Sequence, residues 1–385
     1  EIKNRFIESV ERRMVSDVPF GAFLSGGIDS SLVVGVMAGE LDKKISTFNV
    51  SFDETEYSES QYARQVADKF GTDHHEILLS PDSFLDSLPD ALAAIDHPSG
   101  DGPNSWIVSR ETKRQGITMA LSGLGGDEFF AGYDVFRQLP TVAEKNWLLS
   151  FPKEIRSLVG SGLKTLNPGI RSLKTSELLK LDYFNLEHLY PVFRKSFFPN
   201  QVQKFLSNNS PIEDRVQTVV QGLENYHEFE SLPVLSRISI SEMKSYMQSV
   251  LLRDTDQMSM AHALEVRVPF LDHRLIEYVV HVDDRLKYPH TPKKLLVESF
   301  GDLLPANLVN RRKMGFVLPW ENWMRGPLKP FVRERIEHLK SLSDFNAHAL
   351  DAICSDFDNL RPIVNWSRIW MLVALSDWLQ RHDIK

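Results

Sequence analysis

Two glycine-rich turns carry the residues of this chain that could hold a phosphate group. The first, Ser25–Ser31, reads Ser-Gly-Gly-Ile-Asp-Ser-Ser between a short apolar run and an apolar helical pattern. Glycines let such a turn point its N–H groups outward, and a helix start adds further donors and a positive dipole end. The turn therefore suits an anion such as pyrophosphate. Asp29 would repel that anion unless Mg²⁺ lay between them; a simpler interpretation is that Asp29 and Ser30 only cap the helix.

The second turn, Leu121–Glu128, reads Leu-Ser-Gly-Leu-Gly-Gly-Asp-Glu and repeats this order of small residues followed by acidic ones. It does not match Gly-x-Gly-x-x-Gly, because Glu128 stands where the third glycine would be, and no Gly-x-x-x-x-Gly-Lys-Ser/Thr loop occurs in the chain. Asp127 and Glu128 could simply interact with a helix dipole. An aspartate in each of two anion-binding turns favours one composite nucleotide site, in which Asp29 and Asp127 hold Mg²⁺.

These turns need a scaffold that brings them together, and the first third of the chain predicts a mainly parallel sheet. Strand and helix patterns alternate there, which predicts right-handed crossovers and helices on both faces. Ligands of such α/β proteins bind beyond the carboxyl ends of the strands, where both turns would lie. The expected strands are Gly21–Leu24, Ile45–Phe52, His75–Leu79 and Ile117–Leu121, and the expected helices are Ser30–Ala38, Glu59–Phe70, Phe84–Ile95 and Trp106–Lys113.

After about Leu139 the strand patterns fade and helical periodicity dominates, as in Ser239–Leu252, Pro330–Leu339 and Ile363–Leu379. We therefore expect two parts. Residues 1–139 would form an α/β nucleotide-binding part, and residues 140–385 a mostly α-helical part that completes the site.

The chain also begins with a helical pattern, which suggests that it is a fragment of a longer protein. The apolar residues of this pattern recur every four positions. They are Ile2, Phe6, Val10 and Met14.

The composition is that of a globular protein and argues against several classes of partner. With 42% hydrophobic and 25% charged residues among 385, the chain can form two or more domain cores. Its net charge of −8 argues against a general nucleic-acid surface, although Arg311–Lys313 could form a local basic pocket. No apolar run approaches the roughly 18–20 residues of a membrane span. The single cysteine, Cys354, excludes an internal disulfide and fits a reducing cytoplasm.

Taken together with three further motifs, the two turns resemble the synthetase domain of glutamine-dependent asparagine synthetases. The motifs occur in the family's order and run over most of the chain. They are Thr72-Asp73-His74-His75-Glu76, Val266-Arg267-Val268-Pro269-Phe270-Leu271-Asp272-His273-Arg274 and Arg311-Arg312-Lys313-Met314-Gly315-Phe316. The resemblance implies a sheet of the ATP-pyrophosphatase (adenine nucleotide alpha hydrolase-like) type.

The resemblance also implies a role for individual residues. The backbone around Leu24 and Val50 would hold the adenosine part of ATP, and Asp29 and Asp127 would hold Mg²⁺. Lys293 would neutralise negative charge during the reaction, with Lys294 as the alternative and a solvated lysine pair as the simpler interpretation. The residues implied to grip the pyrophosphate are Ser25, Gly26, Gly27, Asp29 and Ser30, and Ser122 and Gly123 would complete the nucleotide pocket.

The implied reaction has two steps. A substrate carboxylate, that of L-aspartate in the family, attacks the α-phosphorus of ATP and releases pyrophosphate, and ammonia then converts the acyl-adenylate to an amide and AMP. The carboxylate needs no base because it is already ionised near neutral pH. Positioning and electrostatics would supply most of the acceleration.

Two departures from the family pattern bear on this expectation. Asparagine synthetases usually carry Glu at the position of Leu124, at the acyl-adenylate and ammonia end of the site. Another acceptor, such as a uronic acid of a surface polysaccharide, therefore stays an alternative, as do an amide-forming cyclase and a non-catalytic ATP-binding module. The family's N-terminal glutaminase domain is also missing from this chain. We expect such a domain or partner upstream of Glu1, or free ammonia, and leave a homodimer open.

The remaining polar groups favour structural roles. His74 and His75 neighbour each other on an expected strand, where adjacent side chains point to opposite faces, so a metal site is disfavoured. Asp96, His97 and Asp101 could line an acceptor pocket or form an ordinary polar loop. The charged residues of Leu251–Leu271 could anchor the ionic groups of a substrate or hold two domains together, and we favour the structural role; we expect Cys354 to be inert.

Overall fold

The computed structural model describes residues 1–52, 59–208, 210–223, 225–287, 290–291, 293–310 and 318–384. The chain divides into two compact units. Unit 1 comprises Glu1–Asp96, Asp101–Tyr133 and Ser231–Pro319, and unit 2 comprises His97–Gly100, Asp134–Glu230 and Trp320–Lys385. The expected boundary at residue 139 lies close to the break at Tyr133. Ser231–Pro319, which we expected in the helical part, belongs to the unit that contains the sheet.

Unit 1 contains a parallel sheet with the strand order β3-β2-β1-β4-β5, counted over the described residues. This confirms the predicted α/β class. The strands are β1 (Phe20–Phe23), β2 (Ser46–Ser51), β3 (Asp73–Leu78), β4 (Met119–Leu121) and β5 (Glu265–Arg267). Because β1 lies between β2 and β4, Ala22 pairs with Thr47 on one side and with Leu121 on the other. The chain therefore leaves β1 and β4 at adjacent points of one sheet edge.

The sequence did not predict β5. Two of its three residues are charged, so it shows neither an apolar run nor enough alternation of apolar and polar residues to indicate a strand. Its position is instead fixed by pairing with β4 and by Arg267, whose guanidinium donates to the carbonyl oxygens of Arg13 at 2.9 Å and Val15 at 2.7 Å. Arg267 and Glu265 also form an ion pair at 2.7 Å, so this part of the expected charge network is structural.

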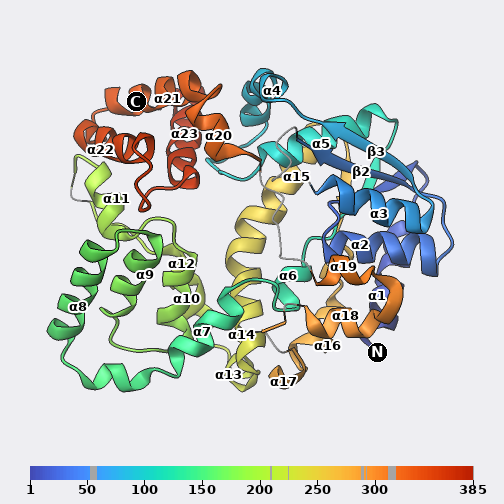
Figure 1. Ribbon diagram of the computed structural model, residues 1–385, viewed down its shortest axis with the longest axis horizontal. Coiled ribbons are helices and arrows are strands. Elements are labelled where there is room, and N and C mark those ends of the chain that lie inside the picture. The colour runs from blue at the N-terminus through green and yellow to red at the C-terminus, as the bar shows by residue number, and fades with distance from the viewer. Residues whose placement is uncertain are drawn as a thin grey trace. The chain divides into compact units, whose positions relative to one another are not determined.

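Helices cover both faces of the sheet, as Figure 1 shows for α2 and α3 on one side and α5 on the other. Alternate residues of β4 serve the two faces: Met119 and Leu121 join the larger core, and Ala120 joins the smaller one. The helices of unit 1 are α1 (Ile2–Met14), α2 (Ile28–Val34), α3 (Ser60–Phe70), α4 (Pro81–Ala93), α5 (Pro103–Arg114), α6 (Gly126–Phe129), α14 (Val234–Glu242), α15 (Leu252–Met260), α16 (His273–Val280), α17 (Asp284–Lys287), α18 (Lys294–Phe300) and α19 (Ala306–Val309).

Unit 2 is helical throughout its described elements, apart from one isolated bridge between Leu206 and Phe345. In it, α8 packs against α9, α10 against α12, and α21 against α23. The helices are α7 (Val135–Ala143), α8 (Lys153–Leu166), α9 (Ile170–Leu178), α10 (Leu186–Arg194), α11 (Pro199–Phe205), α12 (Arg215–Leu223), α13 (His227–Ser231), α20 (Trp320–Arg325), α21 (Lys329–Ser341), α22 (Ala347–Asp358) and α23 (Trp366–Arg381). Among the described residues, no helix is long and apolar enough to cross a membrane.

Several helices follow the sequence pattern closely. α1 buries the four apolar residues expected of it, and α3 ends at Gly71, which takes a left-handed φ of 61°. α2 is shorter than expected because a π-helical segment, Gly35–Glu40, continues it. A second π-helical segment, Met243–Leu251, links α14 to α15.

A buried carboxylate joins the first helix of unit 1 to α16. Asp272 caps α16 by accepting from the Arg274 N–H at 3.0 Å and also pairs with Arg12 at 2.9 Å and Arg13 at 3.0 Å. Burial alone would raise the pKa of Asp272, but the two arginines outweigh that effect and lower it to about 2. A carboxyl group whose pKa is lower in the folded state stabilises the fold above its unfolded pKa and loses this contribution as the pH falls.

We therefore predict that Asp272→Asn lowers the free energy of unfolding by about 1–2 kcal/mol at pH 7. Asparagine can still cap the helix, so the decrease in the free energy of unfolding measures the effect of removing the negative charge. The difference from the wild type should shrink as the pH falls from 4 to 2, measured by urea denaturation. Asp86→Asn, at an exposed position of α4, serves as the control. A difference that stayed constant down to pH 2 would contradict this role.

Candidate nucleotide-binding site

The first turn leaves β1 and enters α2 within a few residues. The Leu24 N–H still donates to the Phe48 carbonyl at 2.8 Å, so the strand pairing extends to the start of the turn. Gly26 has a φ of 78°, and a Cβ atom there would lie 2.6 Å from the backbone nitrogen of Ala63 in α3. The Ser25 hydroxyl accepts from the Gly27 N–H at 3.2 Å and lies 3.0 Å from the Ser30 hydroxyl. The turn is thus narrow, glycine-dependent and lined with hydroxyl groups.

The second turn leaves β4 and enters α6 beside the first. The Ser122 N–H donates to the Arg267 carbonyl of β5 at 2.9 Å, and the Leu124 N–H donates to the Ser122 hydroxyl at 3.4 Å. A Cβ atom on Gly123 would lie 2.6 Å from the Ser30 backbone nitrogen. The two turns therefore pack directly on each other, as the parallel-sheet interpretation predicted.

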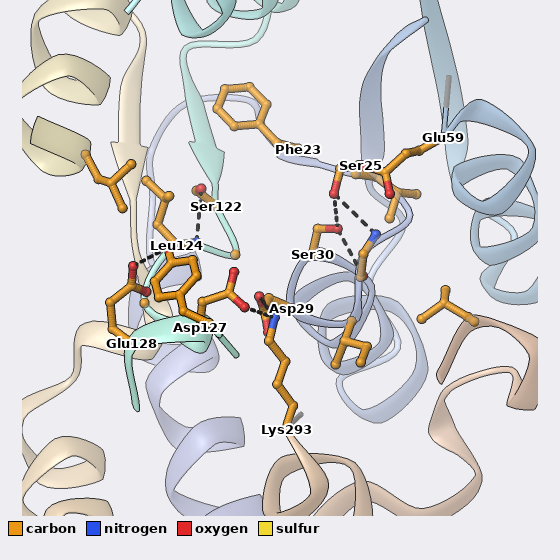
Figure 2. A pocket seen from close by; sticks show the side chains of 18 of the residues that line it. Phe23, Ser25, Asp29, Ser30, Glu59, Ser122, Leu124, Asp127, Glu128 and Lys293 are labelled. Carbon is orange, nitrogen blue, oxygen red and sulfur yellow. Dashed lines mark hydrogen bonds and ion pairs between the residues drawn. The ribbon is translucent and has the colours of Figure 1, made fainter. Parts of the chain in front are cut away.

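Lys293 joins the two turns through their carboxylates. Figure 2 shows its side chain reaching toward Asp29 and Asp127, with which it forms ion pairs; the Lys293 Nζ–Asp127 Oδ1 distance is 2.7 Å. The three side chains are only 7%, 14% and 20% exposed, in the order Lys293, Asp29 and Asp127. Burial lowers the pKa of Lys293, but the charges of Asp127 and Asp29 outweigh it, so the pKa lies above its ordinary value.

The backbone of Lys293 is unusual. Its φ of 60° lies in the left-handed region, which a residue with a side chain adopts at a cost. The Lys293 N–H donates to the Phe130 carbonyl at 3.1 Å, and its carbonyl accepts from the Val297 N–H at 2.9 Å as α18 begins. These bonds aim the side chain at the two turns.

A cavity of about 670 Å³ opens along these residues, within the range typical of small-molecule sites. Gly26 is the only residue of the predicted site that is not among the residues described as lining it, since it faces α3. The predicted residues that do line the cavity are Leu24, Ser25, Gly27, Asp29, Ser30, Val50, Ser122, Gly123, Leu124, Asp127 and Lys293. Asn49 holds the Leu24 carbonyl through its side-chain amide at 3.0 Å.

The sequence interpretation missed part of the acidic and phenolic lining of this cavity. Glu128 is 1% exposed and accepts from the Tyr133 hydroxyl at 2.6 Å. Burial and the charge of Asp127 raise the pKa of Glu128 to about 7, against the opposite effect of that hydrogen bond. Asp101, held by the Tyr246 hydroxyl at 3.1 Å, also has a pKa raised by burial. The sequence indicates Glu128 and Asp101 as candidates, but not the two tyrosines.

Asp254 also lines the cavity and is 2% exposed. Its neighbour Arg253 forms an ion pair with Asp96 at 2.9 Å. One of the charged residues of Leu251–Leu271, for which we favoured a structural role, therefore belongs to the cavity wall. Asp101, which the sequence indicates as a possible pocket residue, belongs to the cavity wall as well.

Other candidate residues lie away from the cavity lining. His74 contacts the Thr47 hydroxyl at 2.9 Å, and His75 stacks on Phe48 at 5.0 Å between ring centroids. Burial raises the pKa of the Cys354 thiol to about 11, which makes it a poor nucleophile near neutral pH. The Arg311–Phe316 motif lies outside the described residues.

The donor set of Asp29 and Asp127 fits Mg²⁺. Both carboxylates reach one cation, the Lys293 ammonium, which demonstrates that they converge on a single point. Two carboxylates with the remaining positions left to phosphate and water are a common Mg²⁺ arrangement. Within the described part of the chain, no group of three or more His, Cys, Asp or Glu residues forms a protein-only metal site.

Comparison with known proteins places this chain in a family. The sequence model of the asparagine synthase family matches residues 1–380, so the chain belongs to that family. The chain is similar to asparagine synthetase (glutamine-hydrolyzing) 1 of Bacillus subtilis (strain 168), with 28% identity over 98% of this chain and 58% of the relative. It is also similar to a putative asparagine synthetase (glutamine-hydrolyzing) of Mycobacterium tuberculosis (strain ATCC 25618 / H37Rv), with 30% identity over 96% of this chain and 56% of the relative.

A third relative carries a different name. Amidase chyE of Penicillium rubens is 28% identical over 90% of this chain and 56% of its own length. The chain thus spans 56–58% of the length of these relatives. The resemblance seen in the two turns and three motifs is confirmed at the level of the family.

The close contact between the two turns can be tested by adding a methyl group where they touch. Gly123→Ala adds a methyl group against backbone atoms that have no rotamer to change, 2.6 Å from Ser30 N and 2.9 Å from the Asp29 carbonyl carbon. We expect the free energy of unfolding to fall by about 1–3 kcal/mol, measured by urea denaturation. Gly222→Ala, where a Cβ meets no atom within 4 Å, is the control. Unchanged stability of Gly123→Ala would show that the turns do not pack this closely.

Proposed function

We propose that this chain uses ATP to activate a carboxylic acid as its acyl-adenylate and transfers the acyl group to ammonia. The observation that carries this proposal is the convergence of Asp29, Asp127 and Lys293 on the wall of one cavity, where two anion-binding turns meet. Membership of the asparagine synthase family supports the same chemistry. The cavity of about 670 Å³ has room for a nucleotide and a small acid.

ATP would lie along the carboxyl edge of the sheet. The backbone around Leu24 and Val50, at the ends of β1 and β2, would hold the adenosine part. The pyrophosphate part would lie on the first turn, on the N–H groups and hydroxyls of Ser25, Gly26, Gly27 and Ser30, where the start of α2 also favours negative charge. Ser122 and Gly123 would close the pocket from the second turn.

Asp29 and Asp127 would hold Mg²⁺, and the bound ion would neutralise the departing pyrophosphate. Lys293 lies at the same point, where the charges of Asp127 and Asp29 raise its pKa and favour the ammonium form. We assign it to the negative charge that develops on the α-phosphate as a carboxylate approaches. The protein's contribution is therefore electrostatic, and no protein base is needed for the first step.

The proposed reaction proceeds in two steps, in each of which one bond forms and one bond breaks. A carboxylate oxygen forms a bond to the α-phosphorus of ATP as the bond to the pyrophosphate oxygen breaks. Ammonia then forms a bond to the acyl carbon and loses a proton, and the bond between that carbon and AMP breaks. The products are an amide, AMP and pyrophosphate.

The ammonia would come from a glutaminase domain or partner. Relatives that are named glutamine-hydrolyzing extend beyond the region matched here, which supports an upstream source. We place the reaction in the cytoplasm, where ATP is available.

The acceptor is L-aspartate in our proposal, with a uronic acid as the alternative. Leu124 at the cavity wall favours the alternative, because it offers no charged or hydrogen-bonding group to an aspartate. The acidic lining favours aspartate, since Asp101, Glu128 and Asp254 would attract an ammonium group and a uronic acid has none. We give more weight to these three groups because an ammonium group beside them would favour their ionised form, against the burial that raises the pKa of Asp101 and Glu128.

Pyrophosphate exchange tests the roles proposed for Asp29 and Lys293. Asp29→Asn and Lys293→Ala should each reduce the acid-dependent exchange of labelled pyrophosphate into ATP by at least about 100-fold, because each removes a charge that faces the phosphates. Lys294→Ala is the matched control: the neighbouring lysine is 41% exposed, pairs with Glu298 at 3.7 Å, and should leave exchange within about twofold. Full activity of Lys293→Ala with loss in Lys294→Ala would reverse the assignment.

The acceptor can be tested with matched acids in the same assay. L-aspartate should support exchange, and succinate, which differs by lacking the ammonium group, should be at least about tenfold weaker. Exchange with D-glucuronate but not with L-aspartate would move the function to the alternative. If ATP binds and no acid in a broad panel supports exchange, the catalytic proposal fails and an ATP-binding module is left.

A further inference from the structure

Two tyrosines line the cavity and take no part in the proposed transfer to phosphorus. Tyr133 and Tyr246, which we call the tyrosine pair, both belong to the cavity wall. The Tyr133 hydroxyl donates to Glu128 at 2.6 Å, and the Tyr246 hydroxyl donates to Asp101 at 3.1 Å. The two rings meet edge to face, with 6.5 Å between their centroids and 74° between their planes. Two phenols, each bonded to a carboxyl group, therefore lie next to each other on the wall of one cavity.

Tyr133 is held beside Asp127 by the short segment that follows α6. The Gly132 N–H donates to the Asp127 carbonyl at 2.9 Å, and a Cβ atom on Gly132 would lie 1.9 Å from Asp127 Oδ1. The carbonyl of Phe130, three residues before Tyr133, accepts from the Lys293 N–H at 3.1 Å. The phenol of Tyr133 is thus fixed next to the charges that we assign to Mg²⁺ and the phosphates.

Tyr246 comes from the π-helical segment Met243–Leu251. Such turns are rare in proteins and frequently occur at functional sites. Here the segment and the start of α15 contribute Tyr246, Leu251, Asp254 and Thr255 to the cavity wall. The irregular helix therefore presents a phenol, an apolar side chain and a carboxylate to the same cavity.

The tyrosine pair lies at the end of the cavity where the acyl group would be. In an in-line displacement, the attacking and leaving oxygens lie on opposite sides of the phosphorus. Figure 2 shows Ser25 and Ser30, which we propose bind the departing pyrophosphate, on one side of Asp127. Glu128 lies on the other side, and the tyrosine pair is joined to it by a hydrogen bond. The acyl carbon would therefore face this pair.

The direction of the hydrogen bonds limits what the tyrosine pair can bind. A phenol carries one hydrogen and two lone pairs. Since each hydroxyl of the pair donates its hydrogen to a carboxyl group, it can act toward a ligand only as an acceptor. Ammonia carries three N–H donors and one lone pair, which must stay free to attack the acyl carbon. Two acceptors bind its N–H groups and leave that lone pair free, whereas a donor would engage it.

The pair suits neutral ammonia better than a charged ammonium group. Glu128 can attract the ammonium group of an acceptor through space, but it is 1% exposed, so a ligand on this side meets the Tyr133 hydroxyl first. A charged group that leaves water needs an opposite charge in direct contact, whereas neutral ammonia needs only hydrogen-bond acceptors. Leu124 lines the same cavity, and its side chain has no donor that could bind the lone pair.

We propose that Tyr133 and Tyr246 form the binding site for ammonia: their hydroxyl oxygens accept from two of its N–H groups and direct its lone pair to the acyl carbon. This inference rests on the proposed function, because it requires an acyl-adenylate in the cavity. It deepens that function by assigning the nitrogen nucleophile to two residues that have no role in adenylation. Their contribution is to bind and orient ammonia.

The split between two half-reactions tests this assignment. In amide formation from ATP, L-aspartate and ammonium chloride, Tyr246→Phe and Tyr133→Phe should each raise the KM for ammonium about tenfold, because each removes one acceptor. Pyrophosphate exchange with L-aspartate needs no ammonia and should fall less than about threefold. Tyr278→Phe is the matched control, since this tyrosine is 38% exposed, contacts Arg5 and is not among the described lining residues. It should change neither measurement.

The possible outcomes separate this inference from the proposed function. Circular dichroism would establish that the variants are folded, and Tyr246→Phe carries the test alone if Tyr133→Phe unfolds. An unchanged KM for ammonium, or a raised KM for L-aspartate in its place, would overturn the ammonia site and leave the proposed function standing. A lower kcat at saturating ammonium with an unchanged KM would also overturn it, because the pair would then act on the reaction rather than on binding. A wild type without acid-dependent exchange would overturn the proposed function and the ammonia site together.

Discussion

The site depends on placing three charges in a space that water reaches poorly. Asp29 and Asp127 repel each other, and that repulsion grows as the surrounding dielectric falls. The Lys293 ammonium lies between them and makes their approach favourable. Removing one member of such a buried group costs more than the pair contributes, because an uncompensated charge is left behind. The ion pairs therefore constrain all three segments, and this constraint does not depend on the proposed acceptor.

The fold places these three charges together by bringing segments that are distant in the sequence to one edge of the sheet. Residue 29 lies in the first turn of α2, residue 127 in the first turn of α6, and residue 293 directly precedes α18. The neighbouring positions of β1 and β4 bring the first two together, and Gly123 lets the turns touch. Lys293 comes from the part of the chain that follows β5. Its left-handed backbone is accommodated because the Phe130 carbonyl and the start of α18 both bond to it.

The sequence predicted the parts of this arrangement that depend on local chemistry. The four expected strands occur within a few residues of their expected bounds, because apolar runs between glycine-rich turns have few alternatives. β5 was missed because a three-residue strand with two charged residues carries no pattern. For the same reason residues 231–319 were assigned to the helical part, although they belong to unit 1.

The cavity wall could be predicted only in part. Asp29 and Asp127 stood out because acidic residues are unusual beside glycine-rich turns of the type that suits an anion. Asp254 and Tyr246 gave no such signal, since one lies among other charged residues and the other in an ordinary helical pattern. Their position depends on where α15 and the π-helical segment before it lie against the sheet. Tertiary packing of this kind leaves little trace in residue spacing.

The central claim, that a carboxylate attacks the α-phosphorus, can be tested most directly with an oxygen label. The chain would be incubated with ATP, Mg²⁺, ammonium and L-aspartate labelled with ¹⁸O in its side-chain carboxylate, and the nucleotide products analysed by mass spectrometry. The account predicts AMP that carries one ¹⁸O atom, together with unlabelled pyrophosphate. Formation of ADP with ¹⁸O in inorganic phosphate would show attack at the γ-phosphorus and would contradict it.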